Sequence, residues 1–399
     1  MIALRSTRVL LNTDLLPADV VIEGEYILDV LPYGSAPYAI DLGDRLLSPG
    51  FVDLHSDAVE KEIEPRSGVF FPVDAALVEL DKKLACCGIT TMFHAVAFYE
   101  ESVAGTRKPE MSAHIIRSIH ELNKQTFRVD NFIHVRYEAT SFGSVAAIVD
   151  LIESNMVQLL SFMDHSPGQG QYRRLDNWLR DHQATFGIDE DEARQVIDIM
   201  DGKKHLSAEK LQHLAQCARS RNITLISHDD DGEKKIDAMR TLGVSVSEFP
   251  VNEDAAFYAR RHGLATGMGA PNVVRGTSHN DNISARRLIE KRACDYLCSD
   301  YHPVAMLQAV YTLNRELGVS LGESLRLITA NPARIAGLSD RGEIRPDSLA
   351  DLAVIDDSGI ATVVFSMKSG IPVFNGLGRG LGADTLNHRG SSAIKEAAL

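Results

Sequence analysis

Residues 49–340 repeat one pattern eight times: a short apolar segment followed, in most cases, by a stretch of amphipathic helical periodicity. The apolar segments are FVDLHS, GITTMFHAVAF, NFIHVRYEAT, VQLLSFMDHS, ITLISHDD, VSVSEFPVN, LATGMGAPN and DYLCSDY. Between them, the spacing of apolar residues predicts helices at 74–87, 110–125, 207–221 and 233–242. Eight β–α units over about 290 residues are typical of a (β/α)8 TIM-like barrel. A doubly wound open sheet fits less well, because no G-x-G-x-x-G follows an early strand and eight units exceed that fold.

The two ends of the chain have a different pattern. Segments such as ALRSTRVLL near the start and ATVVFSMKSGIPVFNG near the end alternate Val or Ile with polar residues. This alternation is typical of half-buried strands. We therefore expect residues 1–48 and 341–399 to pair into one small β-sandwich domain, and residues 49–340 to form the barrel. A long, polar, helix-rich stretch near 166–206 predicts an insertion over the barrel mouth.

Composition narrows the classes of partner. The 399 residues carry a net charge of −14, with 44% apolar and 24% charged residues, which is ordinary for a globular protein. The acidic balance argues against a nucleic-acid or membrane surface, although a local basic pocket for a small polyanion is compatible with it. Five cysteines without regular spacing favour reduced thiols. With no secretory leader pattern and no apolar run near the ~20 residues of a membrane span, we expect a cytoplasmic protein.

Polar residues end most of the predicted barrel strands. The carboxyl ends of all strands of such a barrel meet at one mouth, so these side chains would converge there. Imidazole nitrogen and carboxylate oxygen suit zinc or another divalent metal. His94 and His134 lie inside strands two and three, where we expect buried, hydrogen-bonded side chains instead. The candidate metal ligands are His55, Asp57, Glu138, His165, His228 and Asp300.

A metal at the mouth would support hydrolysis. A bound divalent ion lowers the pKa of water from ~15.7 toward ~7, and a neighbouring carboxylate can accept the proton. Asp300, the last strand-end carboxylate, is our candidate for this general base. Zn²⁺ is the first expectation, with Mn²⁺ or Fe²⁺ as alternatives. The number of ions stays open at one or two, with two favoured if Glu138 bridges them.

Several longer motifs resemble a known family. PGFVDLHSD, GITT, CSDYHP, NPARIAGL and GEIRPDSLADLAV resemble the amidohydrolase superfamily. Within it, DLHSDAVEKEIEPR, FMDHSPGQGQY, SHDD, SEFPVN and GMGAPNVVRG look like the phosphonate-degradation branch. The resemblance implies a barrel with a small β domain and a divalent metal centre. It also implies hydrolysis of α-D-ribose 1-methylphosphonate 5-triphosphate to diphosphate and α-D-ribose 1-methylphosphonate 5-phosphate. A homo-oligomer, and association with other phosphonate-degradation enzymes, are further expectations.

The sequence departs from the wider superfamily in three places. The common His-x-His of the first strand is His55-x-Asp57 here. The fourth strand has no bridging lysine, for which Glu138 is a candidate stand-in. The sixth-strand segment SVSEFPVN has no histidine, and His165 on the fourth strand is a candidate replacement.

The implied substrate carries at least four acidic groups, so the mouth should present basic side chains and backbone N–H groups. Basic and amide side chains do follow the predicted strand ends, most of them in the loops GQGQYRR and APNVVRG. His302 joins them because alternation with Asp300 also points it inward. The candidate substrate-binding residues are Lys61, Arg66, Arg107, Gln169, Gln171, Tyr172, Arg173, Asn272, Arg275 and His302.

Two other functions stay open. One is a cyclic amidase or deaminase on the same barrel, which would need few basic residues and commonly keeps His-x-His. The other is a metal-free barrel that serves as a binding scaffold, whose signature would be loss of ligands. Metal analysis separates the scaffold from both enzymes, and a substrate panel separates the enzymes.

Overall fold

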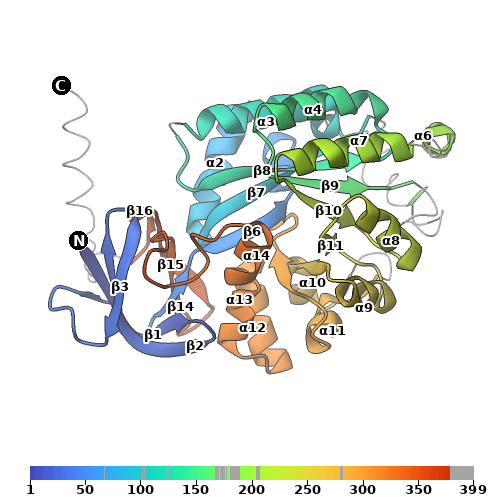
Figure 1. The fold of residues 1–399 in the computed structure, drawn as a ribbon. Helices are drawn as coiled ribbons and strands as arrows, with labels where there is room; N and C mark the ends of the chain where they lie inside the picture. Colours follow the sequence, from blue (N-terminus) through green and yellow to red (C-terminus); the bar gives the residue numbers. More distant parts are fainter. Residues whose placement is uncertain are drawn as a thin grey trace, which may run out of the picture.

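The computed structural model describes residues 1–66, 68–100, 102, 104–124, 126–166, 170, 176, 178–179, 189–203, 207–278 and 282–377. Two sheets organise this part of the chain, a parallel barrel and a smaller sheet beside it (Figure 1). Among the helices described, none is both long and apolar enough to cross a membrane.

Eight parallel strands form the barrel in sequence order. They are β6 (Phe51–Ser56), β7 (Ile89–Phe98), β8 (Asp130–Glu138), β9 (Leu159–Met163), β10 (Thr224–His228), β11 (Val246–Glu248), β12 (Ala265–Gly269) and β13 (Tyr296–Cys298). The first and last strands close the ring: the Asp57 amide donates to the Asp300 carbonyl at 2.7 Å, and the Asp300 amide to the His55 carbonyl at 2.9 Å. All eight predicted segments are therefore barrel strands, and the predicted (β/α)8 fold is confirmed.

Helices surround the barrel with their apolar faces inward (Figure 1). On α3, for example, Ile115, Ile116 and Ile119 recur at helical spacing and are fully buried. The main helices are α2 (Val73–Cys86), α3 (Pro109–Leu122), α4 (Val145–Glu153), α7 (Ser207–Ser220), α8 (Glu233–Thr241), α9 (Glu253–Arg261), α12 (Ala305–Leu317), α13 (Leu321–Arg326) and α14 (Ala330–Ile335).

Shorter helices lie next to the carboxyl ends of strands. They are α1 (Ala58–Ile63) after β6, the 3₁₀ turns η1 (Gly105–Arg107) and η2 (Phe142–Ser144), and α10 (Ala270–Arg275) with α11 (Ala285–Glu290) after β12. Helix α10 ends at Gly276, whose φ of 76° is the left-handed conformation that glycine adopts without strain. Part of the predicted insertion is described, including α6 (Glu190–Lys203) and Trp178.

Strands from both chain ends form the second sheet, which Figure 1 shows as blue and red strands side by side. They are β1 (Ile2–Leu11), β2 (Asp14–Glu23), β3 (Tyr26–Pro32), β4 (Ile40–Asp41), β5 (Leu46–Pro49), β14 (Leu352–Asp356), β15 (Thr362–Lys368) and β16 (Ile371–Asn375). The eight strands make one continuous, mostly antiparallel sheet, in which β5 pairs with β14 and so joins the two ends. A separate apolar cluster that includes Leu4, Leu47 and Phe365 forms its core. The expected small β domain built from both ends is confirmed for the described residues.

A partly buried group of charges ties this sheet to the barrel. Arg341, 7% exposed, contacts Asp130 at the start of β8 and Asp340 at 2.9 Å. Lys368, at the end of β15, lies 3.1 Å from Asp130 and 3.2 Å from Asp351. Because these contacts link the two sheets, they fix the small domain against the barrel end that is opposite the carboxyl ends of the strands.

Candidate metal centre and substrate pocket

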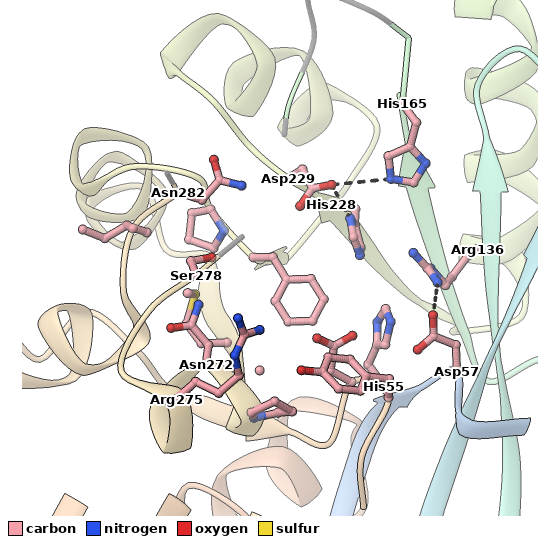
Figure 2. A pocket seen from close by; sticks show the side chains of 18 of the residues that line it. His55, Asp57, Arg136, His165, His228, Asp229, Asn272, Arg275, Ser278 and Asn282 are labelled. Carbon is pink, nitrogen blue, oxygen red and sulfur yellow. Dashed lines mark hydrogen bonds and ion pairs between the residues drawn. The ribbon is translucent and has the colours of Figure 1, made fainter. Parts of the chain in front are cut away.

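A pocket opens at the carboxyl ends of the barrel strands (Figure 2). It holds about 1150 Å³ of empty space counting its open mouth. Its lining includes His55, Asp57, Arg107, Arg136, His165, His228, Asp229, Phe249, Asn272, Arg275, Ser278, Asn282 and Asp300. Five of the six predicted metal ligands are in this lining; Glu138 is not.

The first group of candidate ligands joins the first and last strands. His55, Asp57 and Asp300 each offer one ligand atom within 4.8 Å of the others. His55 lies near the end of β6, and Asp57 follows that strand directly. The hydrogen bonds that close the barrel at β13 bring Asp300 beside them. Burial, with the positive charge of Arg136, lowers the pKa of His55 to about 3, so its imidazole is neutral and able to ligate at pH 7.

The second group lies on β9 and β10. His165, His228 and Asp229 are buried, and Asp229 Oδ2 lies 3.1 Å from His228 Nδ1 and 3.5 Å from His165 Nε2. Burial opposes a charged His165, but hydrogen bonds to Asp229 and Glu138 raise its pKa to about 9, so a metal ion that binds at His165 has to displace a proton. The rings of His55 and His228 are 5.5 Å apart, so the two groups are neighbours.

The backbone at three strand ends is held in the left-handed region. Asp229, Phe249 and Asp300 have φ values of 56°, 54° and 60°. For the bulky Phe249 this conformation costs on the order of 1–3 kcal/mol, and such strain concentrates at functional sites. It places the Phe249 ring 5.2 Å from His55 and 5.0 Å from His228 (centroid to centroid), so that the ring packs against one histidine of each group.

These donors fit a divalent metal. Among the described residues, Asp57 Oδ1, His134 Nε2 and His228 Nε2 are buried ligand atoms without a hydrogen-bond partner. Leaving such atoms unsatisfied costs free energy, and coordination is one way in which proteins satisfy them. Nitrogen and oxygen donors with no thiolate suit Zn²⁺, Mn²⁺ or Fe²⁺.

Behind His55 lies a third buried group, which sequence reasoning missed. His55 Nδ1 is 2.6 Å from Glu248 Oε2, and the Tyr296 hydroxyl donates to Glu248 Oε1 at 2.8 Å. Glu248 ends β11, so the sixth strand offers a carboxylate where a histidine was expected. Gly267 makes room for Tyr296, because a Cβ at this position would lie 2.1 Å from the tyrosine ring. A carboxylate bonded to one imidazole nitrogen fixes the ring and leaves the other nitrogen for a metal.

Glu138 has a different position from the one expected of a ligand or a metal bridge. Its carboxylate accepts from the His165 amide at 3.2 and 3.3 Å and lies 3.0 Å from His165 Nδ1. It is fully buried and outside the pocket lining. The reason is that Glu138 ends β8 and the neighbouring strand β9 ends just before His165. The amide and the ring of His165 therefore bind both carboxylate oxygens of Glu138. Glu138 therefore orients His165. On the other side, buried Trp178 donates its indole N–H to the His165 carbonyl at 3.0 Å.

The predicted substrate-binding residues divide into three sets. Arg107, Asn272 and Arg275 line the pocket. Lys61, Arg66 and His302 are exposed and lie outside its lining, so the structure does not bring them together with the other three, and their role in binding stays a prediction. The helix α1 starts directly after Asp57 and turns Lys61 toward solvent. After β13, Tyr301 and not His302 lines the pocket. Gln169, Gln171, Tyr172 and Arg173 lie outside the described residues.

The acidic residues after Asp57 do not pair with Lys61 or Arg66. Glu60, nearly buried, holds Arg107 through Nε at 2.9 Å and a terminal nitrogen at 2.8 Å. Glu62 contacts Lys83 on α2. The charged stretch therefore places Arg107 at the pocket and anchors α1 to α2.

Comparison with known proteins agrees with this geometry. The sequence profile of the amidohydrolase family matches residues 73–365, and the chain belongs to this family. A relative from Escherichia coli K12, α-D-ribose 1-methylphosphonate 5-triphosphate diphosphatase, is 32% identical over 322 residues, which cover 80% of this chain and 85% of the relative. The expected resemblance to the phosphonate-degradation branch is thereby confirmed.

Solved structures show the same fold at low identity. An amidohydrolase from a Sargasso Sea environmental sample is 15% identical, covers 99% of this chain and 98% of its own, and has a TM-score of 0.63. N-acetyl-D-glucosamine-6-phosphate deacetylase from Mycobacterium smegmatis is 15% identical, with 93% and 99% coverage and a TM-score of 0.56. At these identities the likeness concerns the fold alone.

Proposed function

We propose that the chain is a metal-dependent phosphoanhydride hydrolase that acts on α-D-ribose 1-methylphosphonate 5-triphosphate. The products would be diphosphate and α-D-ribose 1-methylphosphonate 5-phosphate. The observation that carries this proposal is one pocket that combines two groups of His and Asp side chains with three arginines, Arg107, Arg136 and Arg275. The name of the 32% identical relative supports the same reaction.

The residues proposed to hold the metal are His55, Asp57 and Asp300 in one group and His165 and His228 in the other. A divalent ion bound there would supply Lewis acidity to the attacking water and neutralise phosphate charge. Glu248 and Glu138 fix the rings of His55 and His165 from outside the pocket, which reduces the reorganisation needed for binding.

Asp300 is the proposed general base. Burial, together with the charge of Asp57, raises the pKa of Asp300 to about 8, although Arg136 opposes this rise. A carboxylate beside the proposed metal ligands can accept the proton of the attacking water. In the proposed step the Asp300 carboxylate accepts a proton from water, the water oxygen bonds to phosphorus, and the bond linking the α and β phosphates breaks. The electron pair of that bond leaves with diphosphate if water attacks the α phosphorus, or with the ribose 5-phosphate if it attacks the β phosphorus; both routes give the same two products.

The pocket has two unlike walls that suit the two ends of this substrate. Figure 2 shows the histidines and aspartates with Arg136 on one side, and Asn272, Arg275, Ser278 and Asn282 on the other. Asn272 Oδ1 accepts from the Ala285 amide at 3.0 Å, which ties α10 to α11 and stiffens the second wall. We propose that the first wall holds the reacting phosphates and that the second wall holds the far end of the substrate.

A substrate panel tests the reaction. Purified protein with metal should release diphosphate from the ribose 5-triphosphate, followed by phosphorus NMR, and should turn over neither dihydroorotate nor hydantoins. Turnover of a cyclic amide without release of diphosphate would refute the proposal in favour of a cyclic amidase. Absence of a tightly held divalent ion in carefully prepared protein would instead favour a scaffold.

A further inference from the structure

Arg136 was not expected from the sequence to take part in the site, yet it lies in the pocket lining beside Asp57. We propose that Arg136 binds a nonbridging oxygen of the phosphate that reacts, and so acts as a substrate-contacting residue of the hydrolysis. This inference rests on the proposed function and adds a residue and a role to it.

The first argument is position. Arg136 lies near the carboxyl end of β8, between His134 and Glu138, and alternation along the strand points all three side chains into the barrel. Arg136 as a whole is 5% exposed, so its guanidinium has little contact with bulk water. In Figure 2 its guanidinium lies beside Asp57 at the edge of the cavity, on the same side as His55 and His228.

The second argument is the shortage of partners. One terminal nitrogen of Arg136 lies 3.3 Å from Asp57 Oδ2, a long contact, and within the described part of the chain its buried Nε has no hydrogen-bond partner. A guanidinium has five N–H donors. A buried charge that is paired this weakly is costly, and an anionic oxygen in the pocket would offset that cost.

The third argument is that the nearby carboxylates are already engaged. Asp57 Oδ2 is shared with Arg107, which lies at the same distance of 3.3 Å. Glu60 holds Arg107, and Glu138 holds His165. Two cations therefore share one oxygen of Asp57, and a phosphate group is the kind of ligand whose several oxygens match two guanidinium groups.

Arg136 also neighbours the groups proposed to carry the chemistry. It contacts Asp57 and lines the same pocket as Asp300, so a phosphate bound at Arg136 would be held next to the proposed metal ligands.

Arg107 and Arg136 are distinguishable by their surroundings. The Arg107 side chain is 25% exposed and firmly held by Glu60, whereas that of Arg136 is 7% exposed and weakly held. We therefore expect Arg107 to contribute mainly to substrate capture and Arg136 to the reacting phosphate. If Arg136 served only to neutralise Asp57, any cation of similar size at this position would be sufficient.

Arg136→Lys tests this, because lysine keeps the charge but not the planar fork. In the metal-loaded enzyme we expect kcat to fall about 100-fold or more, as when one preorganised donor is removed, while KM changes only a few-fold. Arg136→Gln should also weaken binding of inorganic diphosphate, measured by calorimetry, at least about tenfold. Metal content and thermal unfolding are measured for each variant, and Arg117→Lys, on the outer surface, is the matched control.

The outcomes separate this inference from the proposed function. If the parent enzyme hydrolyses the ribose triphosphate while Arg136→Lys keeps its kcat and Arg136→Gln keeps its diphosphate affinity, the inference is overturned and the function stands. If the parent enzyme does not hydrolyse that substrate, but diphosphate binding depends on Arg136, the function fails and the phosphate-binding role is supported. Loss of metal from Arg136→Lys in parallel with kcat would also overturn the inference, since Arg136 would then act by supporting Asp57.

Discussion

Replacing Glu248 by Gln should weaken metal binding without changing the fold. Glu248 is fully buried, and its carboxylate joins His55 Nδ1 at 2.6 Å to the Tyr296 hydroxyl at 2.8 Å. Gln has almost the same shape and its amide oxygen can still accept from His55. The substitution therefore removes the negative charge that strengthens this bond and increases the donor strength of the other imidazole nitrogen.

The expected loss of metal affinity follows from the change of a charged hydrogen bond at His55 into a neutral one. Bonds to a charged group contribute roughly 1.5–3 kcal/mol and neutral ones roughly 0.5–1.5 kcal/mol, so the difference is about 1–1.5 kcal/mol. This corresponds to about a tenfold loss of affinity, at the lower end of the ~10–100-fold found for partners of metal-ligating histidines. Tyr296→Phe leaves the bond to His55 in place, so we expect a smaller loss for it.

The assay is competition between the protein and a zinc-binding indicator at pH 7, with circular dichroism as the check on folding. Glu233→Gln, at an exposed position on α8, is the matched control and should keep the parent affinity. A Glu248→Gln protein that is folded and binds zinc within twofold of the parent would refute the view that Glu248 prepares His55 for a metal.

Four further results are expected. Asp300→Asn should lower kcat by about 10²–10⁴ and leave diphosphate binding nearly unchanged in calorimetry, as for loss of a general base; equal losses of both would indicate a structural role. Removing metal with a chelator should lower Tm, since an ion at 100 times its Kd stabilises by about 2.7 kcal/mol, and an unchanged Tm would contradict a metal centre. Arg341→Met should reduce the free energy of urea unfolding by about 1.5–3 kcal/mol, the range for hydrogen bonds to charged groups, because it removes the contacts with Asp130 and Asp340 while Lys368 still pairs with Asp130 and Asp351; a loss below about 0.5 kcal/mol would show that this link is dispensable. The hydrogen bond from Arg5 lowers the pKa of Asp19 from 3.8 to about 2, so its stabilisation is present above pH 4 and lost as the pH falls through 2; Asp19→Asn should therefore be less stable than the parent at pH 7, by a difference that shrinks in acid.

The barrel could be predicted because its signals are local. Each strand is a short apolar segment bounded by turns or helices, so even β11 and β13, three residues each, were recognised from their neighbours. Pairing of β5 with β14 was foreseen only as a pairing of chain ends. The register that unites eight strands in one sheet depends on contacts between residues some 300 positions apart, which periodicity does not encode.

A site residue could be predicted where its position at the end of a strand is enough to bring its side chain into the pocket. It could not be predicted where a residue on a neighbouring strand binds that side chain instead. His55, Asp57, His165, His228 and Asp300 end strands and reach the pocket. Glu138 also ends a strand, but the amide and ring of His165 engage it.

Arg136 and Glu248 also lie at or near the carboxyl ends of barrel strands, but the sequence did not single them out, for two different reasons. Arg136 is embedded in the apolar segment NFIHVRYEAT, and Glu248 occupies a strand for which only histidine was considered. For Arg136, the two-residue alternation of a strand was the available signal, because it places Arg136 on the same face as His134 and Glu138. The oligomeric state and the partners stay predictions.

Asp57 gains a physical reason from its neighbours. A histidine at this position would lie next to Arg107 and Arg136, both 3.3 Å from Asp57 Oδ2, and could balance neither charge. A carboxylate can do two things at once, since Oδ2 holds both guanidinium groups while Oδ1 has no hydrogen-bond partner among the described residues. A pocket for a neutral ring needs no such arginines and can use two histidines. Asp57 and the two arginines therefore form one arrangement of charges in this pocket, and this arrangement supports the proposed polyanionic substrate.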